Sequence, residues 1–257
     1  MAEKFNVGWL YPDLMNIYGD RGNIVTLLKR TQWRGYDANL VELPRGVTEG
    51  MDEVDVFFFG GGQDREQSLV YEDLLEYKQP LIESAVASGA MILAVCGGYQ
   101  LLGHYYRTAD GQQFPGIGLI DAHTDAGPRR LIGDVVVDIE GLSLDPPNLV
   151  GFENHSGRTF LGPKAAPLGK VRLGSGNNGE DGTEGCVQGA VIGTYLHGSL
   201  LPKNPQLADH LIGRALKRRG VESLSALDDA VELEAHARIL ERERQRRAPA
   251  AGPARLR

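Results

Sequence analysis

The rhythm of apolar and polar positions changes near residue 103 of the chain. Before that point, short and nearly continuous apolar runs alternate with segments in which apolar residues recur every three or four positions. The pattern predicts strands at 4–11, 37–43, 54–61 and 90–95, and helices at 22–35, 64–78 and 80–89. Apolar strands separated by helices are typical of a parallel sheet covered on both faces.

After residue 103 the apolar runs are shorter and are joined by turns rich in glycine and proline. They predict a mixed or antiparallel extension with strands at 133–139, 149–154, 169–174 and 190–197, followed by helices at 204–220 and 228–247. The segment "GSGNNGEDGTEG" at 174–185 has the composition of a mobile loop. We expect one α/β domain over residues 1–245 and a disordered basic tail at 246–257.

Composition narrows the class of protein. The chain has 257 residues, of which 42% are hydrophobic and 24% charged, as in ordinary soluble domains. No apolar run approaches the roughly 18 residues of a membrane helix, and no secretory signal is recognisable. Two cysteines form neither a disulfide framework nor a metal-binding pair, and a formal charge of −7 argues against nucleic-acid binding. We therefore expect a cytoplasmic protein without a metal site and without membrane insertion.

Cys96 stands between the apolar run "MILAV" and the segment "GGYQLLGHYY", for which we predict a helix over 97–106. Ligands of parallel sheets bind at the carboxyl ends of the strands, and a helix N-terminus favours a thiolate. The backbone N–H of Gly97 is a candidate donor to an oxyanion. The alternative interpretation is a buried structural cysteine.

A nucleophilic cysteine needs a base, and His197 follows another apolar strand. His155 also ends a predicted strand, which makes it the rival base or a substrate contact. The three glycines of "VFFFGGGQDREQ" allow close approach to a ligand, so that Gly61 or Gly62 becomes the second oxyanion donor beside Gly97. The alternative is a flexible turn before a helix.

Four segments together, "FFFGGGQDREQ", "AVCGGYQLLG", "GFENHSGRT" and "GTYLHG", resemble the class I glutamine amidotransferases of the cobyric-acid-synthase-like group. With "YGDRGN" and "LPKNP", the chain is most similar to the glutaminase subunits of lipid II isoglutaminyl synthases, from about residue 5 to 245. The resemblance implies a three-layer, flavodoxin-like α/β fold with a mainly parallel central sheet.

The resemblance also implies roles for particular residues. Cys96 would attack the glutamine carboxamide, His197 would carry the proton, and Gly61 and Gly97 would bind the oxyanion. Substrate-binding residues would be Gln100, Arg130, Asn154 and His155. Many relatives carry a carboxylate two residues after the histidine, where this chain has Ser199. We therefore expect the carboxylate that orients His197 to come from the partner subunit.

No phosphate-binding loop appears in the sequence, although amidation of a carboxylate normally needs ATP. The resemblance implies a heterodimer with a Mur-ligase-like (MurT-like) synthetase that holds ATP and Mg and amidates D-glutamate of lipid II. Activity would then lie at the inner face of the plasma membrane. The alternatives are a subunit for another acceptor, such as a corrinoid carboxylate, or a non-catalytic binding module. An α/β-hydrolase is disfavoured because the G-x-S-x-G serine is absent.

Overall fold

A six-stranded sheet in the order β11-β12-β4-β3-β1-β2 is the centre of the computed structural model, which describes residues 3–247. Its strands are β1 (Lys4–Leu10), β2 (Asp37–Leu43), β3 (Val56–Phe59), β4 (Met91–Val95), β11 (Cys186–Gln188) and β12 (Val191–Thr194). All neighbours pair in parallel except β11, which is antiparallel to β12. Every residue of β3, β4 and β12 is buried, which explains their unbroken apolar runs.

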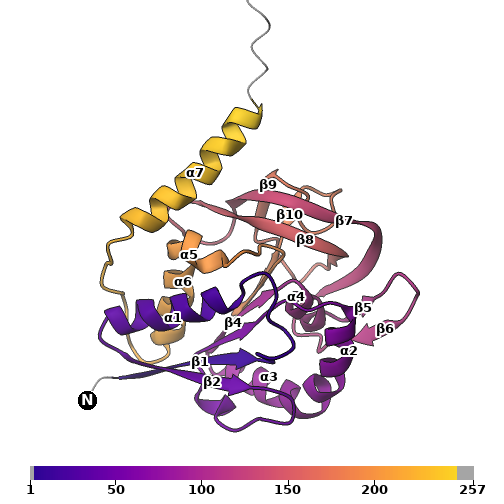
Figure 1. Cartoon of the computed structure of the whole chain (residues 1–257). Coiled ribbons are helices and arrows are strands. Elements are labelled where there is room, and N and C mark those ends of the chain that lie inside the picture. The colour runs from indigo at the N-terminus through magenta and orange to yellow at the C-terminus, as the bar shows by residue number, and fades with distance from the viewer. Residues whose placement is uncertain (1–2, 248–257) are drawn as a thin grey trace, which may run out of the picture.

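Helices cover both faces of this sheet (Figure 1). The helices α1 (Arg21–Trp33), α5 (Leu200–Lys203) and α6 (Pro205–Lys217) form one layer. The other layer contains α2 (Asp64–Asp73), a π-helical turn (Leu74–Lys78), α3 (Gln79–Ala87) and α4 (Gly97–Leu102). The long helix α7 (Ala230–Arg247) packs against α5 and the strand Asn148–Leu161, where His236 is buried, and its C-terminal end points away from the body of the molecule (Figure 1). The predicted α/β fold with a mainly parallel sheet is therefore confirmed.

A second sheet, in the order β10-β9-β7-β5-β6 with β8 paired to β7, forms the extension. Its strands are β5 (Tyr105–Arg107), β6 (Gln113–Pro115), β7 (Ala122–Ile139), β8 (Asn148–Leu161), β9 (Gly169–Leu173) and β10 (Thr183–Glu184). The antiparallel pair β7–β8 dominates it and is interrupted by a bulge between Ala126 and Leu131. Both strands are much longer than the apolar runs predict. Burial alternates along the second half of β8, but its buried positions 153, 155, 157 and 159 carry polar residues or glycine, so no apolar pattern marks them.

Two sequence predictions need correction. The helix expected over 97–106 ends at Leu102, and residues 105–107 pair with β6 and β7 instead. The segment at 174–185 is packed rather than mobile: Asn177 is fully buried, and the Glu153 carboxylate accepts hydrogen bonds from the N–H groups of Ser175 and Gly176. The predicted tail lies outside the described residues, except that residues 246–247 end α7.

Candidate functional site

Cys96 occupies a sharp turn between β4 and α4, with φ +52° and ψ −107°, which L-residues rarely adopt. Its N–H donates to Thr194 O of the neighbouring strand β12 at 2.9 Å. A Cβ on Gly97 would lie 2.8 Å from Gly62 O, and one on Gly98 would lie 2.5 Å from Phe59 O. Only glycine fits at these two positions, so the strained turn holds the thiol at the carboxyl edge of the parallel sheet.

His197 lies three residues beyond β12 and is fully buried. Backbone hydrogen bonds to Phe152 of β8, at 2.8 and 3.3 Å, fix its position. Burial by itself would lower the pKa of the imidazole, but the nearby Cys96 and Asp20 outweigh it and raise the pKa of His197 to about 10. The imidazole therefore keeps its proton beside Cys96 at neutral pH.

Asp20, from the "YGDRGN" motif, is the carboxylate beside this histidine. It is fully buried, and its Oδ1 lies 3.7 Å from His197 Nδ1, beyond hydrogen-bond length but within ion-pair distance. The other oxygen, Oδ2, accepts a hydrogen bond of 2.6 Å from the N–H of Gly61. This chain thus places a carboxylate of its own at ion-pair distance from His197, although neither Asp20 Oδ1 nor His197 Nδ1 has a hydrogen-bond partner among the described residues. That a partner subunit supplies the orienting carboxylate stays a prediction.

Ser199 fastens the loop that carries Asp20. Its Oγ donates a 2.6 Å hydrogen bond to Gly19 O, and its backbone has the left-handed φ of +50°. The ring of Tyr18 makes an edge contact with the imidazole of His197 at a centroid distance of 5.0 Å. Ser199 therefore does not supply the carboxylate; it fastens the loop on which the Asp20 carboxylate stands.

The N–H of Gly61 is already engaged by Asp20, which corrects its expected role as an oxyanion donor. Within the described residues, the N–H groups of Gly62 and Gly97 donate to no acceptor. The two residues are in close contact, since a Cβ on Gly97 would lie 2.9 Å from Gly62 N. Gly62, the alternative weighed from the sequence, is therefore the better placed donor beside Gly97.

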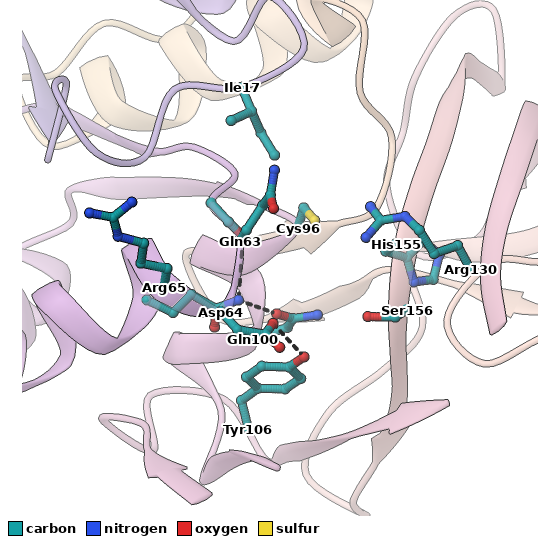
Figure 2. A pocket seen from close by; sticks show the side chains of 12 residues that line it. Ile17, Gln63, Asp64, Arg65, Cys96, Gln100, Tyr106, Arg130, His155 and Ser156 are labelled. Atoms are coloured by element: carbon teal, nitrogen blue, oxygen red, sulfur yellow. Dashed lines mark hydrogen bonds between the residues drawn. The ribbon is translucent and has the colours of Figure 1, made fainter. Parts of the chain in front are cut away.

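A cavity of about 200 Å³ opens beside Cys96 (Figure 2). Its lining comes from both sheets and consists of Ile17, Gly62, Gln63, Asp64, Arg65, Gln67, Cys96, Gln100, Tyr106, Arg130, His155 and Ser156. His197 does not line this cavity, whereas Cys96 does.

Arg130 lies on the bulge of β7, at the rim of the cavity (Figure 2). Its Nε and Nη2 each donate a 2.8 Å hydrogen bond to Asn154, one to Oδ1 and one to the main-chain oxygen. Asn154 itself is not part of the lining. Asn154 therefore orients the guanidinium group, which is the group available to an anionic ligand.

His155 lies in the middle of β8, and not at a strand end as predicted. Its Nδ1 is 2.9 Å from Gly157 O, and its ring stacks on Tyr195 at a centroid distance of 3.5 Å. Burial lowers the pKa of His155, which keeps the imidazole neutral. Gln100 lines the cavity and donates to the Tyr195 hydroxyl at 3.1 Å. Both residues shape the cavity wall.

Sequence reasoning did not assign Asp20 or several residues of the lining, among them Gln67 and Tyr106. Asp20 stands in a motif that was noticed for its resemblance alone, and its distance in sequence from His197 hides their contact. The described residues contain no group of three or more histidine, cysteine or acidic side chains that could hold a metal. None of their helices has both the length and the apolar character needed to cross a bilayer.

Comparison with protein families and relatives agrees with this geometry. Residues 6–205 match the CobB/CobQ-like glutamine amidotransferase domain. The chain is 41% identical over 233 residues to the lipid II isoglutaminyl synthase (glutamine-hydrolyzing) subunit GatD of Staphylococcus aureus, covering 90% of this chain and 92% of that protein. It is 40% identical to the GatD subunit of Streptococcus pneumoniae, covering 84% and 82%. Cobyric acid synthase of Pelotomaculum thermopropionicum is 31% identical, but the match spans only 34% of its length.

Solved structures share the fold at low sequence identity. A structure described as a glutamine amidotransferase superposes with a TM-score of 0.55 at 19% identity, covering 81% of this chain and 98% of that chain. PurLQS from Thermotoga maritima superposes with a TM-score of 0.56 at 15% identity, covering 93% and 100%. At these identities the likeness concerns the architecture alone.

Proposed function

The chain belongs to the family of CobB/CobQ-like glutamine amidotransferase domains, and from this premise we propose that it is the glutaminase subunit of a lipid II isoglutaminyl synthase. One observation carries the proposal: a thiol on a strained turn lies beside a buried histidine, in a chain that aligns with GatD subunits over most of both lengths. A structural cysteine would need neither the strained backbone nor the charged neighbour.

The reaction begins when the Cys96 thiolate attacks the side-chain carbonyl carbon of glutamine. The N–H groups of Gly62 and Gly97 bind the oxyanion that forms. His197, held by Asp20, gives its proton to the amide nitrogen, the C–N bond breaks, and ammonia leaves. His197 then takes a proton from water, whose hydroxide attacks the glutamyl thioester; the C–S bond breaks, glutamate leaves and the thiolate is restored.

The chain has no phosphate-binding loop with which to activate an acceptor for this ammonia. In our proposal it forms a heterodimer with a Mur-ligase-like (MurT-like) synthetase, which holds ATP and Mg and activates the α-carboxylate of D-glutamate in the lipid II stem peptide. Support comes from the two GatD relatives, each named as a subunit of a lipid II isoglutaminyl synthase. The complex would work in the cytoplasm, at the inner face of the membrane that carries lipid II.

The experiment uses this chain with and without a co-expressed Mur-ligase-like partner. Glutamate release from glutamine is measured first, and amidation of D-glutamate in lipid II is measured with the complex and ATP. Cys96→Ala should abolish both activities, lowering glutamate release at least about 10³-fold, because no other group replaces the nucleophile. Cys186→Ala, which removes the other buried cysteine, is the matched control and should keep both.

Two results would contradict the proposal. Glutaminase activity that survives in Cys96→Ala would remove the assigned mechanism. An active glutaminase whose ammonia reaches a corrinoid carboxylate, and never lipid II, would replace the acceptor and favour the cobyric acid synthase relatives.

A further inference from the structure

Gln67, on the inner face of α2, has a buried acceptor with no partner. The side chain lines the cavity beside Cys96 and is only 2% exposed. Its Nε2 donates to Gln100 Oε1 at 2.9 Å and lies 3.4 Å from Gly62 O, whereas its Oε1 has no hydrogen-bond partner. A buried acceptor without a protein donor is unfavourable, so a ligand in the cavity that supplies an N–H or O–H would gain a hydrogen bond there.

The orientation of the Gln67 amide follows from its neighbours. Gly62 O can only accept, so the Gln67 atom that faces it must be the NH₂ group. The same NH₂ faces Gln100, whose facing atom must then be oxygen, and this leaves Gln100 Nε2 to donate to the Tyr195 hydroxyl. Tyr195 in turn lies 2.7 Å from Thr159. These hydrogen bonds together settle the orientation of the Gln67 amide, so the unpartnered atom is its oxygen, Oε1.

Glutamine brings two N–H groups into the cavity: the carboxamide and the α-ammonium. The carboxamide nitrogen must face His197, which protonates it, and His197 lies outside the cavity lining. The α-ammonium is left for the unpartnered acceptors of the lining, Gln67 Oε1 and His155 Nε2, of which Gln67 lies on the same helix as Asp64. Charge favours Gln67, since Asp64 also lines the cavity, whereas Arg130 stands on another side of it and suits the α-carboxylate (Figure 2).

We propose that Gln67 Oε1 accepts a hydrogen bond from the α-ammonium group of glutamine and is a specificity-determining residue for an α-amino substrate. This inference rests on the proposed glutaminase function. Gln67 makes no contact with the reacting carboxamide; it discriminates glutamine from γ-carboxamides that lack the α-amino group. Gln100 and Tyr195 hold it in place from behind.

The test combines one substitution with one change of substrate. Glutaramate is glutamine without its α-amino group, and kcat/KM is measured for both compounds with the wild-type chain and with Gln67→Met. Gln67→Met should lower kcat/KM for glutamine about 10- to 100-fold, the range expected for a hydrogen bond to a charged group. For glutaramate kcat/KM should change by less than about threefold, because the lost bond is absent there.

Controls separate specificity from misfolding. Gln79→Met makes the same chemical change on α3, outside the cavity lining, and should leave the glutamine-to-glutaramate ratio at the wild-type value. Alkylation of Cys96 by iodoacetamide, at an unchanged rate in Gln67→Met, reports an intact site. If Gln67→Met lowers kcat/KM equally for glutamine and glutaramate, or if the variant does not fold, Gln67 is structural and the inference is wrong. A wild-type chain that hydrolyses neither compound overturns the proposed function itself.

Discussion

The two sheets contribute to the site in different ways. The parallel sheet and its loops place the reacting groups: Cys96 and Gly97 follow β4, His197 follows β12, and Gly62 follows β3. The second sheet is mixed, since β5 runs parallel to β7, but its main pair β7–β8 is antiparallel and gives it the name antiparallel sheet. It places Arg130, His155 and Ser156 from within β7 and β8, with their side chains in the cavity wall. Chemistry therefore depends on where strands stop, and substrate contact depends on which face of a long strand a residue occupies.

This contrast predicts that changes on the two sheets have separable kinetic effects. Substitutions of the reacting groups at the ends of the parallel strands should change kcat, because these groups act on the bond that breaks. Groups of the antiparallel sheet should act mainly on KM, because they hold the part of glutamine that does not react.

The largest effect should come from Asp20→Asn. We expect kcat to fall about 10²- to 10⁴-fold, because His197 loses the charge that holds its proton and ring orientation. Asp20 helps to raise the pKa of His197, so the variant pKa should fall and the alkaline limb of the kcat profile should move to lower pH. Steady-state kinetics from pH 6 to 10.5 measure both.

Asp13→Asn, on the exposed part of the same loop, is the control and should behave as the wild type. An unchanged kcat in Asp20→Asn, measured in the complex with the synthetase, would return the orienting role to a carboxylate of the partner.

A smaller effect should follow Arg130→Ala, on the antiparallel side. KM for glutamine should rise about 10- to 100-fold with kcat changed little, since we propose that the guanidinium, which lines the cavity, binds the α-carboxylate and not the carboxamide. Arg129→Ala, which removes the neighbouring exposed arginine, is the matched control. A fall in kcat at constant KM in Arg130→Ala would contradict the assignment of substrate binding to the antiparallel sheet and of the reaction to the parallel sheet.

The smallest effect on activity, and a measurable one on stability, should come from Glu184→Gln. Burial raises the pKa of Glu184 to about 7, so the folded chain binds this proton more tightly than the unfolded chain does. The corresponding stability is present below the ordinary carboxyl pKa and is lost as pH rises to 7, a change on the order of 3 kcal/mol. Urea unfolding at pH 5 and pH 8 should show this loss in the wild type and not in Glu184→Gln.

Glu180→Gln changes an exposed glutamate of the same segment, 174–185, and is the control. Its unfolding should have the same pH dependence as that of the wild type. Equal pH dependence in Glu184→Gln and the wild type would assign the loss to other groups.

The sequence predicted the parallel half well, because buried parallel strands are apolar throughout and their ends are easily seen. Cys96 and His197 were found from such ends. The antiparallel half was harder, since the buried positions in the second half of β8 carry polar residues or glycine, and His155 in mid-strand looked like a strand end. Asp20 was missed because contact between residues 20 and 197 is a tertiary event that no local pattern encodes.

The bond between Asp20 and Gly61 has a wider consequence. The Asp20 carboxylate belongs to the loop before α1. One of its oxygen atoms contacts the His197 imidazole and the other the glycine turn after β3, so a single side chain positions all three. A displacement of that loop would therefore disturb the position of the imidazole and of the glycine turn at the same time.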